Sequence, residues 1–235
     1  MLNNELEQQK EIYSYKLWRH KFDFAEINKR NYHKIIRDYF KLSTKKITVL
    51  AMLLAIEVVL TAVTGNIMRL IPLNGFFVIE FSFFMILLIL LATNLFYAML
   101  IFLASTWMRM GITGAEPVGL IAMTITDGSF LLLFAFLIFL IKFFLVRTNN
   151  TREQNIKFIK YSNIVILFVM VIVVSGIGVL INWTFILSMY GIPDEASGAM
   201  LWPIFGFNIL KYSLNAIIYM SMYKAMIGLV NIYKI

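Results

Sequence analysis

The sequence contains no cysteine, and charged residues make up only 14% of its 235 residues. Without cysteine, disulfide bonds, thiolate metal sites and cysteine nucleophiles are all excluded. A soluble globular domain carries about 25% charged residues. The shortage of charge therefore argues against a water-exposed surface over most of the chain.

Sequence motifs of the common catalytic sites are also missing. There is no GxxxxGK[ST] phosphate-binding loop, no HExxH zinc motif and no GxSxG nucleophile elbow. The only two histidines, His20 and His33, lie in the polar first part of the chain. We expect no enzymatic activity, and any active transport would have to draw its energy from another subunit.

Long apolar stretches replace the missing charge. The chain is 60% hydrophobic, with 21 phenylalanines and 14 methionines, and its mean hydropathy is +0.80. Such a surface must face lipid, and spanning a bilayer as a helix needs about 20 mainly apolar residues. The sequence predicts an all-α membrane protein, a bundle of six transmembrane helices. The predicted spans are residues 47–64, 76–93, 95–110, 118–146, 164–189 and 201–227.

The basic residues are unevenly distributed. Eleven of the 21 Lys and Arg residues lie in residues 1–46, which we predict to be a basic cytoplasmic extension preceding a transmembrane domain of residues 47–235. A solvated extension and an amphipathic segment on the membrane surface are both compatible with this pattern. The charge is not placed as a nucleic-acid-binding surface would require, so we expect no nucleic-acid partner.

Loop charge tests the predicted number of spans. Lysine and arginine are enriched in cytoplasmic loops. With six spans and the basic N-terminus inside, the loop around residues 147–160 and the C-terminal tail also lie inside, and both carry basic residues. The opposite side carries only Arg69 and Arg109 as basic residues. We therefore predict a multi-pass protein of the cell membrane with both termini cytoplasmic.

Polar residues at membrane depth mark the candidate site. Lys211 lies well inside the last predicted span, and Asn208 and Asn215 are spaced to share its helical face. Asn182 adds an amide at similar depth in the fifth span. A charged group in the bilayer costs about 2.5–3.5 kcal/mol on insertion scales, which favours an outward-facing polar pocket. Polar contacts that only hold helices together are the alternative.

Three acidic residues also fall within or beside the predicted spans. Glu57 lies in the first span, Glu80 at the start of the second and Asp127 in the fourth. Glu80 is a candidate substrate-binding residue, although its position near the interface is also compatible with simple solvation. Ala51 and Ala55 form a small-xxx-small pair on the first span, which allows close approach of another helix, within this chain or outside it.

Several short segments resemble those of a known family, the substrate-binding S components of energy-coupling factor (ECF) vitamin transporters. Residues 181–191, I-N-W-T-F-I-L-S-M-Y-G, are similar to the family's fifth-helix motif. Residues 207–211, F-N-I-L-K, are similar to its sixth-helix motif, and residues 79–82 to its second-helix start. Ala51 and Ala55 match its docking motif on the first helix. Ser188 and Gly206 stand where the family pattern has proline.

The resemblance is closest to the riboflavin-specific branch and implies a role. It implies a six-helix bundle that binds riboflavin or a related vitamin near its outer face, under a loop of about residues 65–75. Asn182, Asn208 and Lys211 would contact the ligand. Ala51 and Ala55 would dock on a transmembrane coupling subunit, with two separate ATPase subunits driving import. The chain would need no cofactor of its own.

Three alternatives remain at this point. The first is an S component for another vitamin, such as folate, thiamine or pantothenate. The second is a structural or assembly membrane protein whose polar residues only connect its helices. The third is a lipid-modifying enzyme that uses Glu57 or Asp127 as a base, although no clustered catalytic pattern supports it.

Overall fold

The computed structural model describes residues 33, 37, 39–69, 80–145 and 152–233. Every element in these residues is a helix. Most of the predicted extension of residues 1–46 lies outside them, apart from residues 33, 37 and 39–46, and the first helix already begins at Thr44. The predicted loop at residues 65–75 is described only as far as Arg69, where it continues the first helix. The helices are α3 (Thr44–Arg69), α4 (Phe83–Ala92), α5 (Leu95–Ile112), α6 (Pro117–Leu145), α7 (Arg152–Ile181), the π-helix η1 (Asn182–Ile186), α8 (Leu187–Met189) and α9 (Asp194–Tyr233).

Five of these segments are long and apolar enough to cross a membrane. They are α3, α5, α6, the α7–η1–α8 unit and α9. This confirms the predicted all-α, multi-pass membrane architecture. The remaining predicted span, the second at residues 76–93, is described as a helix only over the ten residues of α4. At 1.5 Å per residue α4 measures about 15 Å, half of a hydrocarbon core of about 30 Å.

The boundary between α4 and α5 falls where the sequence predicts it. Asn94 is the N-cap of α5, and its side-chain oxygen accepts a hydrogen bond from the backbone N–H of Tyr97 at 3.0 Å. Its amide nitrogen donates to the carbonyl of Tyr39 at 2.9 Å. Asparagine is a preferred N-cap because its side chain satisfies a free backbone N–H. The apolar sequence is therefore divided into two helices.

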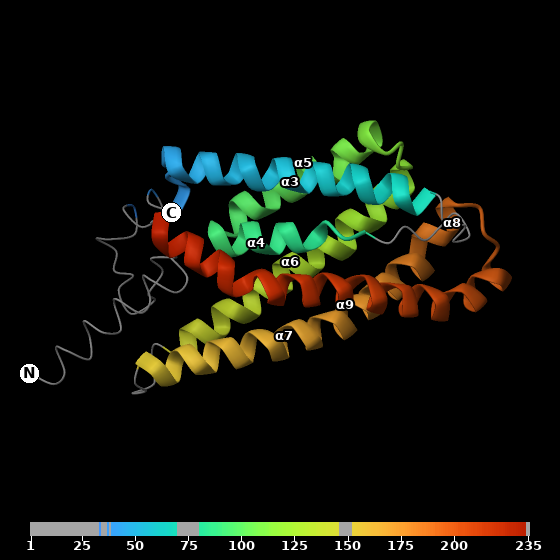
Figure 1. Cartoon of the computed structure of the whole chain (residues 1–235). Coiled ribbons are helices and arrows are strands. Elements are labelled where there is room, and N and C mark those ends of the chain that lie inside the picture. The colour runs from blue at the N-terminus through green and yellow to red at the C-terminus, as the bar shows by residue number, and fades with distance from the viewer. Residues whose placement is uncertain (1–32, 34–36, 38, 70–79, 146–151, 234–235) are drawn as a thin grey trace, which may run out of the picture.

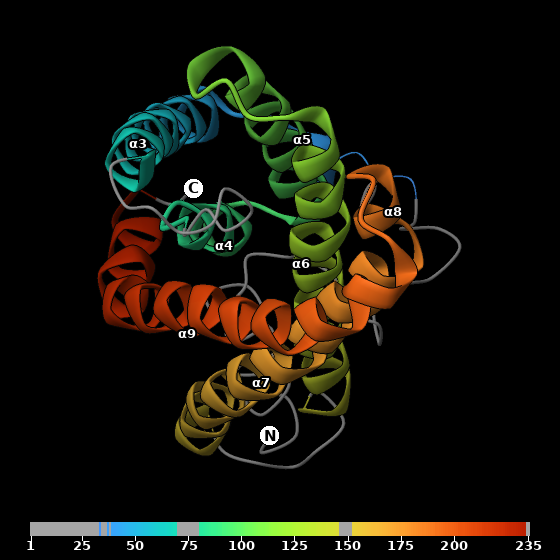
Figure 2. The same cartoon turned by 90° about the vertical axis from the view of Figure 1, so that its right-hand side faces the viewer.

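The short helix α4 lies at the centre of the bundle. Figure 2, which looks along the bundle, shows α4 surrounded by α3, α5, α6 and α9. All ten of its residues are buried, as an element that contacts protein on every side must be. Its direction is opposite to that of α3, and the start of α3 and the end of α9 lie at the same end of the molecule (Figure 1).

The outer helices have the reverse pattern, with large apolar side chains on their outward faces. Phe168 is 70% exposed and Trp202 is 79% exposed. Water cannot solvate so many apolar groups, whereas lipid can. The distribution of exposed side chains therefore agrees with a bundle whose outer surface contacts the bilayer.

One helix changes geometry near its end. After α7, the backbone follows a π-helical turn from Asn182 to Ile186, then one short α-helical turn, α8. Gly191 follows at a φ of +71°, a left-handed conformation that favours glycine. Single π-helical turns inside α-helices occur frequently at functional sites. This interruption begins at Asn182, one of the predicted site residues.

Candidate polar site

Five ionisable side chains are buried in the centre of the bundle, among the residues the structure describes. None exposes more than 5% of its surface. They come from five different parts of the chain, so only the folded bundle brings them together. The five are Glu57 on α3, Glu80 just before α4, Arg109 on α5, Asp127 on α6 and Lys211 on α9.

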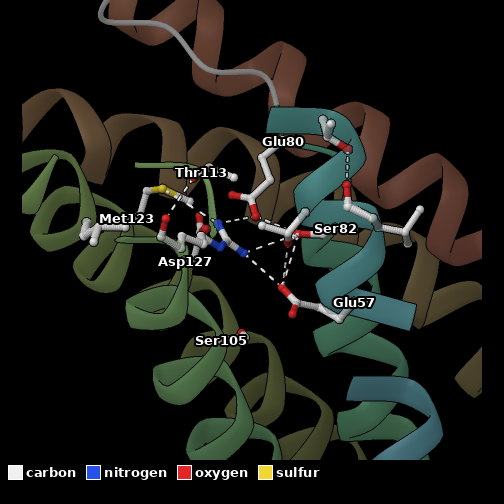
Figure 3. A network of polar contacts seen from close by, with 12 residues as sticks. Glu57, Glu80, Ser82, Ser105, Thr113, Met123 and Asp127 are labelled. Carbon is white, nitrogen blue, oxygen red and sulfur yellow. Dashed lines mark hydrogen bonds and ion pairs between the residues drawn. The ribbon is translucent and has the colours of Figure 1, made fainter. Parts of the chain in front are cut away.

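Arg109 is the centre of the first group of contacts. Its guanidinium forms ion pairs with Glu80 and, at 3.1 Å through Nη2, with Glu57. The Ser82 hydroxyl donates to Glu80 Oε1 at 2.6 Å, and the Thr61 hydroxyl lies 3.1 Å from Glu57 Oε1. Figure 3 shows Glu57 and Glu80 reaching toward the same central region from different segments.

Arg109 was not predicted as a site residue; it lies at the end of the third predicted span and was counted with the basic residues of the outer side. The structure places it inside α5, and Ser105 and Thr106 are buried on the same face. Residues one turn apart share a helical face. This short polar stripe in an otherwise apolar helix is the sequence signal that could have revealed Arg109.

Lys211 and Asp127 form the second group of contacts. Lys211 Nζ lies 2.8 Å from Asp127 Oδ1 and 3.0 Å from Oδ2. The hydroxyl of Tyr212 donates to Asp127 Oδ1 at 2.7 Å. The Asp127 carboxylate thus accepts three hydrogen bonds, two of them from a cation. Such pairing offsets the desolvation of both charges, which neither residue could tolerate alone.

Asn215 connects the two groups. Its amide nitrogen donates to the backbone carbonyl of Glu80 at 2.7 Å and to that of Lys211 at 2.9 Å. Its side-chain oxygen accepts from the backbone N–H of Phe84 at 2.9 Å, in the first turn of α4. This N–H has no partner within its own helix. Asn215 therefore fixes the start of α4 against α9 rather than facing an open pocket.

Asn182 and Asn208 meet at Gly178. The amide nitrogen of Asn182 donates to the Gly178 carbonyl at 2.7 Å. A Cβ atom at Gly178 would lie 2.5 Å from the amide nitrogen of Asn208 and 3.6 Å from a methyl carbon of Thr126. A side chain at position 178 would displace the Asn208 amide, because α9 approaches α7 closely here. Thr126 precedes Asp127, so this contact lies next to the Lys211 ion pair.

Aromatic rings cover the ion pair on its inner side. The rings of Phe130 and Tyr212 are stacked with centroids 5.2 Å apart, and Phe83 meets both edge-on. The Lys211 ammonium lies 5.2 Å from the Tyr212 ring centroid. Rings at these distances attract one another, and a cation over a ring face adds a further stabilising contact.

The predicted site residues thus occupy one region but have different surroundings. Asn208, Lys211 and Asn215 are all buried, as their shared helical face predicts. Asn182 is half-buried beside Asn208, and Glu80 belongs to the Arg109 group. The sequence reasoning did not foresee that Lys211 and Asp127 pair with each other. Ala51 and Ala55 lie apart from this region, exposed on the outward face of α3.

The chemical character of the region follows from these contacts. Its charges are largely neutralised within the chain, and its amides lie beside them. Within the described part of the chain, no group of three or more His, Asp or Glu side chains is arranged to hold a metal ion. The arrangement can offer hydrogen-bonding groups and aromatic surface to a ligand, but few free charges.

Comparisons with known proteins do not assign the chain to a family. No protein family, no curated protein and no solved structure matches it.

Proposed function

We propose that this chain is the membrane-embedded substrate-binding subunit of an ECF-type vitamin transporter, and that its ligand is riboflavin or a related flavin. The motif resemblance and the depth of Asn182, Asn208 and Lys211 support this proposal together. Ionisable groups inside a membrane generally mark a substrate or ion pathway. The bundle of five long helices and one short central helix would then make six passes, with both termini in the cytoplasm.

The observation that carries the choice of ligand is the ion pair of Lys211 with Asp127, at 2.8 Å and 3.0 Å. Because each charge is already neutralised, an added charged group would have no free partner, and desolvating it would cost several kcal/mol. Folate and pantothenate are anions and thiamine is a cation. Riboflavin is uncharged, has many hydrogen-bonding groups and stacks on aromatic rings. The amides of Asn182 and Asn208 suit such a ligand.

The proposed partners follow from the same resemblance. Ala51 and Ala55 are exposed on α3, where a small-residue pair allows a second helix to approach closely. A transmembrane coupling subunit would bind there, and two ATPase subunits would supply energy, since this chain has no phosphate-binding loop. The chain itself would catalyse no reaction.

Ligand identification tests the proposal directly. The full chain is purified in detergent, and bound small molecules are released and identified by mass spectrometry. Riboflavin is then titrated against the protein, with folate, thiamine and pantothenate in parallel. We expect a flavin to copurify and riboflavin fluorescence to be quenched, with no binding of the charged vitamins. A protein that carries no flavin and leaves riboflavin fluorescence unchanged contradicts the proposal.

Variants make the assignment of residues testable. Asn182→Ala and Asn208→Ala should weaken riboflavin binding by up to about tenfold, since each removes an amide whose hydrogen bond is worth up to about 1.5 kcal/mol. Thr184→Ala is the matched control, because Thr184 is exposed on the same π-helical turn and bonds only to its own helix. If all three variants bind riboflavin with the same affinity, the two asparagine amides are not part of the binding site.

The second candidate is a structural membrane protein, and one observation favours it. Lys211, the most costly group in the last helix, has a partner within the chain in Asp127, so no ligand is needed to account for it. Under this alternative, Asn208→Ala and Lys211→Ala lower the melting temperature, and no vitamin raises it. Stabilisation of the purified protein by riboflavin would separate the two functions.

A further inference from the structure

The buried charges of the bundle do not balance. Among the described residues, three carboxylates (Glu57, Glu80 and Asp127) face two cations, Arg109 and Lys211. With all five ionised, one negative charge has no counterpart. A buried charge without a partner is strongly destabilising, and such a group is normally neutralised instead.

Two of the three carboxylates have strong reasons to be ionised. Asp127 accepts both contacts from Lys211 and one from Tyr212. Glu80 forms an ion pair with Arg109, and it also accepts a hydrogen bond from Ser82. Hydrogen bonds from charged donors are about twice as strong as neutral ones. These contacts favour the carboxylate form of both side chains.

Of the three carboxylates, Glu57 has the weakest contact with a cation. Among the residues that the structure describes, its only cationic contact is Arg109 Nη2 at 3.1 Å, and the same guanidinium also pairs with Glu80. Its other close contacts are the hydroxyls of Thr61 at 3.1 Å and Ser82 at 3.4 Å, both neutral. One guanidinium cannot neutralise two carboxylates. Glu57 is therefore the group that carries the excess charge.

The same cluster contains polar atoms without partners. Glu80 Oε2 and Arg109 Nε are buried and make no hydrogen bond in the described structure. Buried polar atoms are nearly always paired, so each exception requires an explanation. One of the two atoms is an acceptor and the other a donor, so the side chains of this cluster do not fully satisfy one another's hydrogen-bonding groups.

We propose that Glu57 is a proton-binding site, and that the bound proton makes the buried network electrically neutral. A proton fits the cluster better than a metal cation. Arg109 Nη2 lies 3.1 Å from Glu57 Oε1 and 3.3 Å from Ser82 Oγ, so a metal ion bound to these oxygens would be held against a positive charge. The proposal concerns the α3–α4–α5 contact and does not depend on the proposed vitamin.

The charged groups that face Glu57 determine whether its carboxyl group keeps the proton. Its helix, α3, packs on α4 and α5, which contribute Glu80 and Arg109. Asp127 on α6 and Lys211 on α9 act on the same cluster from farther away. Arg109 can fully neutralise Glu57 or Glu80, but not both. A movement of α3 relative to α4 that transferred Arg109 to Glu57 would release the proton, so this movement is linked to pH.

Infrared spectroscopy of the full chain in detergent tests the proposal. A protonated carboxylic acid has a carbonyl stretching band distinct from that of a carboxylate. At neutral pH we expect this band in the wild type, with a shift on ¹³C-glutamate labelling, and its loss in Glu57→Gln. The control Glu116→Gln, an exposed glutamate, should keep the band. A band that shifts with labelled aspartate, or that persists in Glu57→Gln, overturns the proposal.

Melting temperatures give an independent test. Glutamine resembles a protonated glutamate in shape and charge, so Glu57→Gln should melt within about 2 °C of the wild type. Glu80→Gln removes a charged partner of Arg109 and should melt at least about 5 °C lower. Equal losses in the two variants, or failure of Glu57→Gln alone to fold, would overturn the proposal. A melting temperature that is higher in sodium than in choline, with the difference lost in Glu57→Gln, would also overturn the proposal. The bound cation would then be sodium.

Discussion

The ammonium of Lys211 lies within 3.0 Å of both carboxylate oxygens of Asp127, a residue 84 positions earlier in the chain. The pair joins α6 to α9 in the interior of the bundle. Each charge stabilises the other at this depth, since an isolated buried charge is far more costly than a paired one. Their contribution to stability must therefore be measured together.

We predict that Asp127→Asn and Lys211→Met each lower the free energy of unfolding by about 3–5 kcal/mol, because each leaves one buried charge without a partner. The double variant should recover most of this loss, since it removes both charges. Thermal unfolding in detergent of the wild type, the single variants and the double variant forms a double-mutant cycle. Additive losses in the double variant would show that the pair is not coupled.

Gly178→Ala should disturb the contact between α7 and α9. The new Cβ would lie 2.5 Å from the amide nitrogen of Asn208, so Asn208 must move or the helices must separate. We expect a lower melting temperature and weaker ligand binding. Gly176→Ala is the matched control: it lies on the same helix with nothing within 4 Å of the added Cβ, and alanine there gains up to about 1 kcal/mol in helix propensity. Similar behaviour of the two variants would contradict the close approach.

The number of passes is testable with introduced cysteines, because the chain has none of its own. Lys45 and Glu195 are exposed in the first turns of α3 and α9, and Lys160 and Lys224 are exposed in the first third of α7 and the last third of α9. With six passes, cysteines at the three lysine positions should react with a membrane-impermeant maleimide only after permeabilisation, and a cysteine at Glu195 should react in intact cells. Labelling of positions 45 and 224 from opposite sides would instead establish an odd number of passes.

If α3 docks on a coupling subunit through its small residues, bulky side chains at those positions should block assembly. Ala51→Phe and Ala55→Phe should abolish copurification with a coupling subunit while leaving the melting temperature and ligand binding of the isolated chain near wild type, because both positions are exposed. Met52→Phe, at an exposed neighbour on the same helix, is the control and should have little effect. If all three variants assemble equally well, a different face forms the contact.

The helices were largely predictable because they are encoded by local apolar runs. The predicted spans beginning at Leu95 and ending at Met189 coincide with helix boundaries in the structure, and the cap residue Asn94 explains the division between α4 and α5. The length of α4 was not predictable, because residues 76–93 are apolar almost throughout. Hydropathy indicates that a segment can be buried. It does not distinguish a long helix from a short helix that is joined to a non-helical stretch.

Some residues of the candidate site could be predicted from the sequence, but their partners could not. Depth and helical spacing selected Asn208, Lys211 and Asn215, and the structure buries all three. Their partners come from distant helices, so the pairing of Lys211 with Asp127 depends on tertiary packing that no local pattern contains. Arg109 was counted with the basic residues of the outer side because it lies at the end of its predicted span. Its place in the network becomes visible only when α3, α4 and α5 are assembled.

The burial of α4 has a consequence for how the protein is made. This helix is surrounded by protein, and the N–H of Phe84 in its first turn is bonded to Asn215 of the last helix. Until that last helix leaves the ribosome, α4 lacks one of its four neighbours and this bond. The interior of the bundle is thus completed from the C-terminal end. A chain cut short before α9 would be left with a half-length helix in the bilayer and an amide that nothing satisfies.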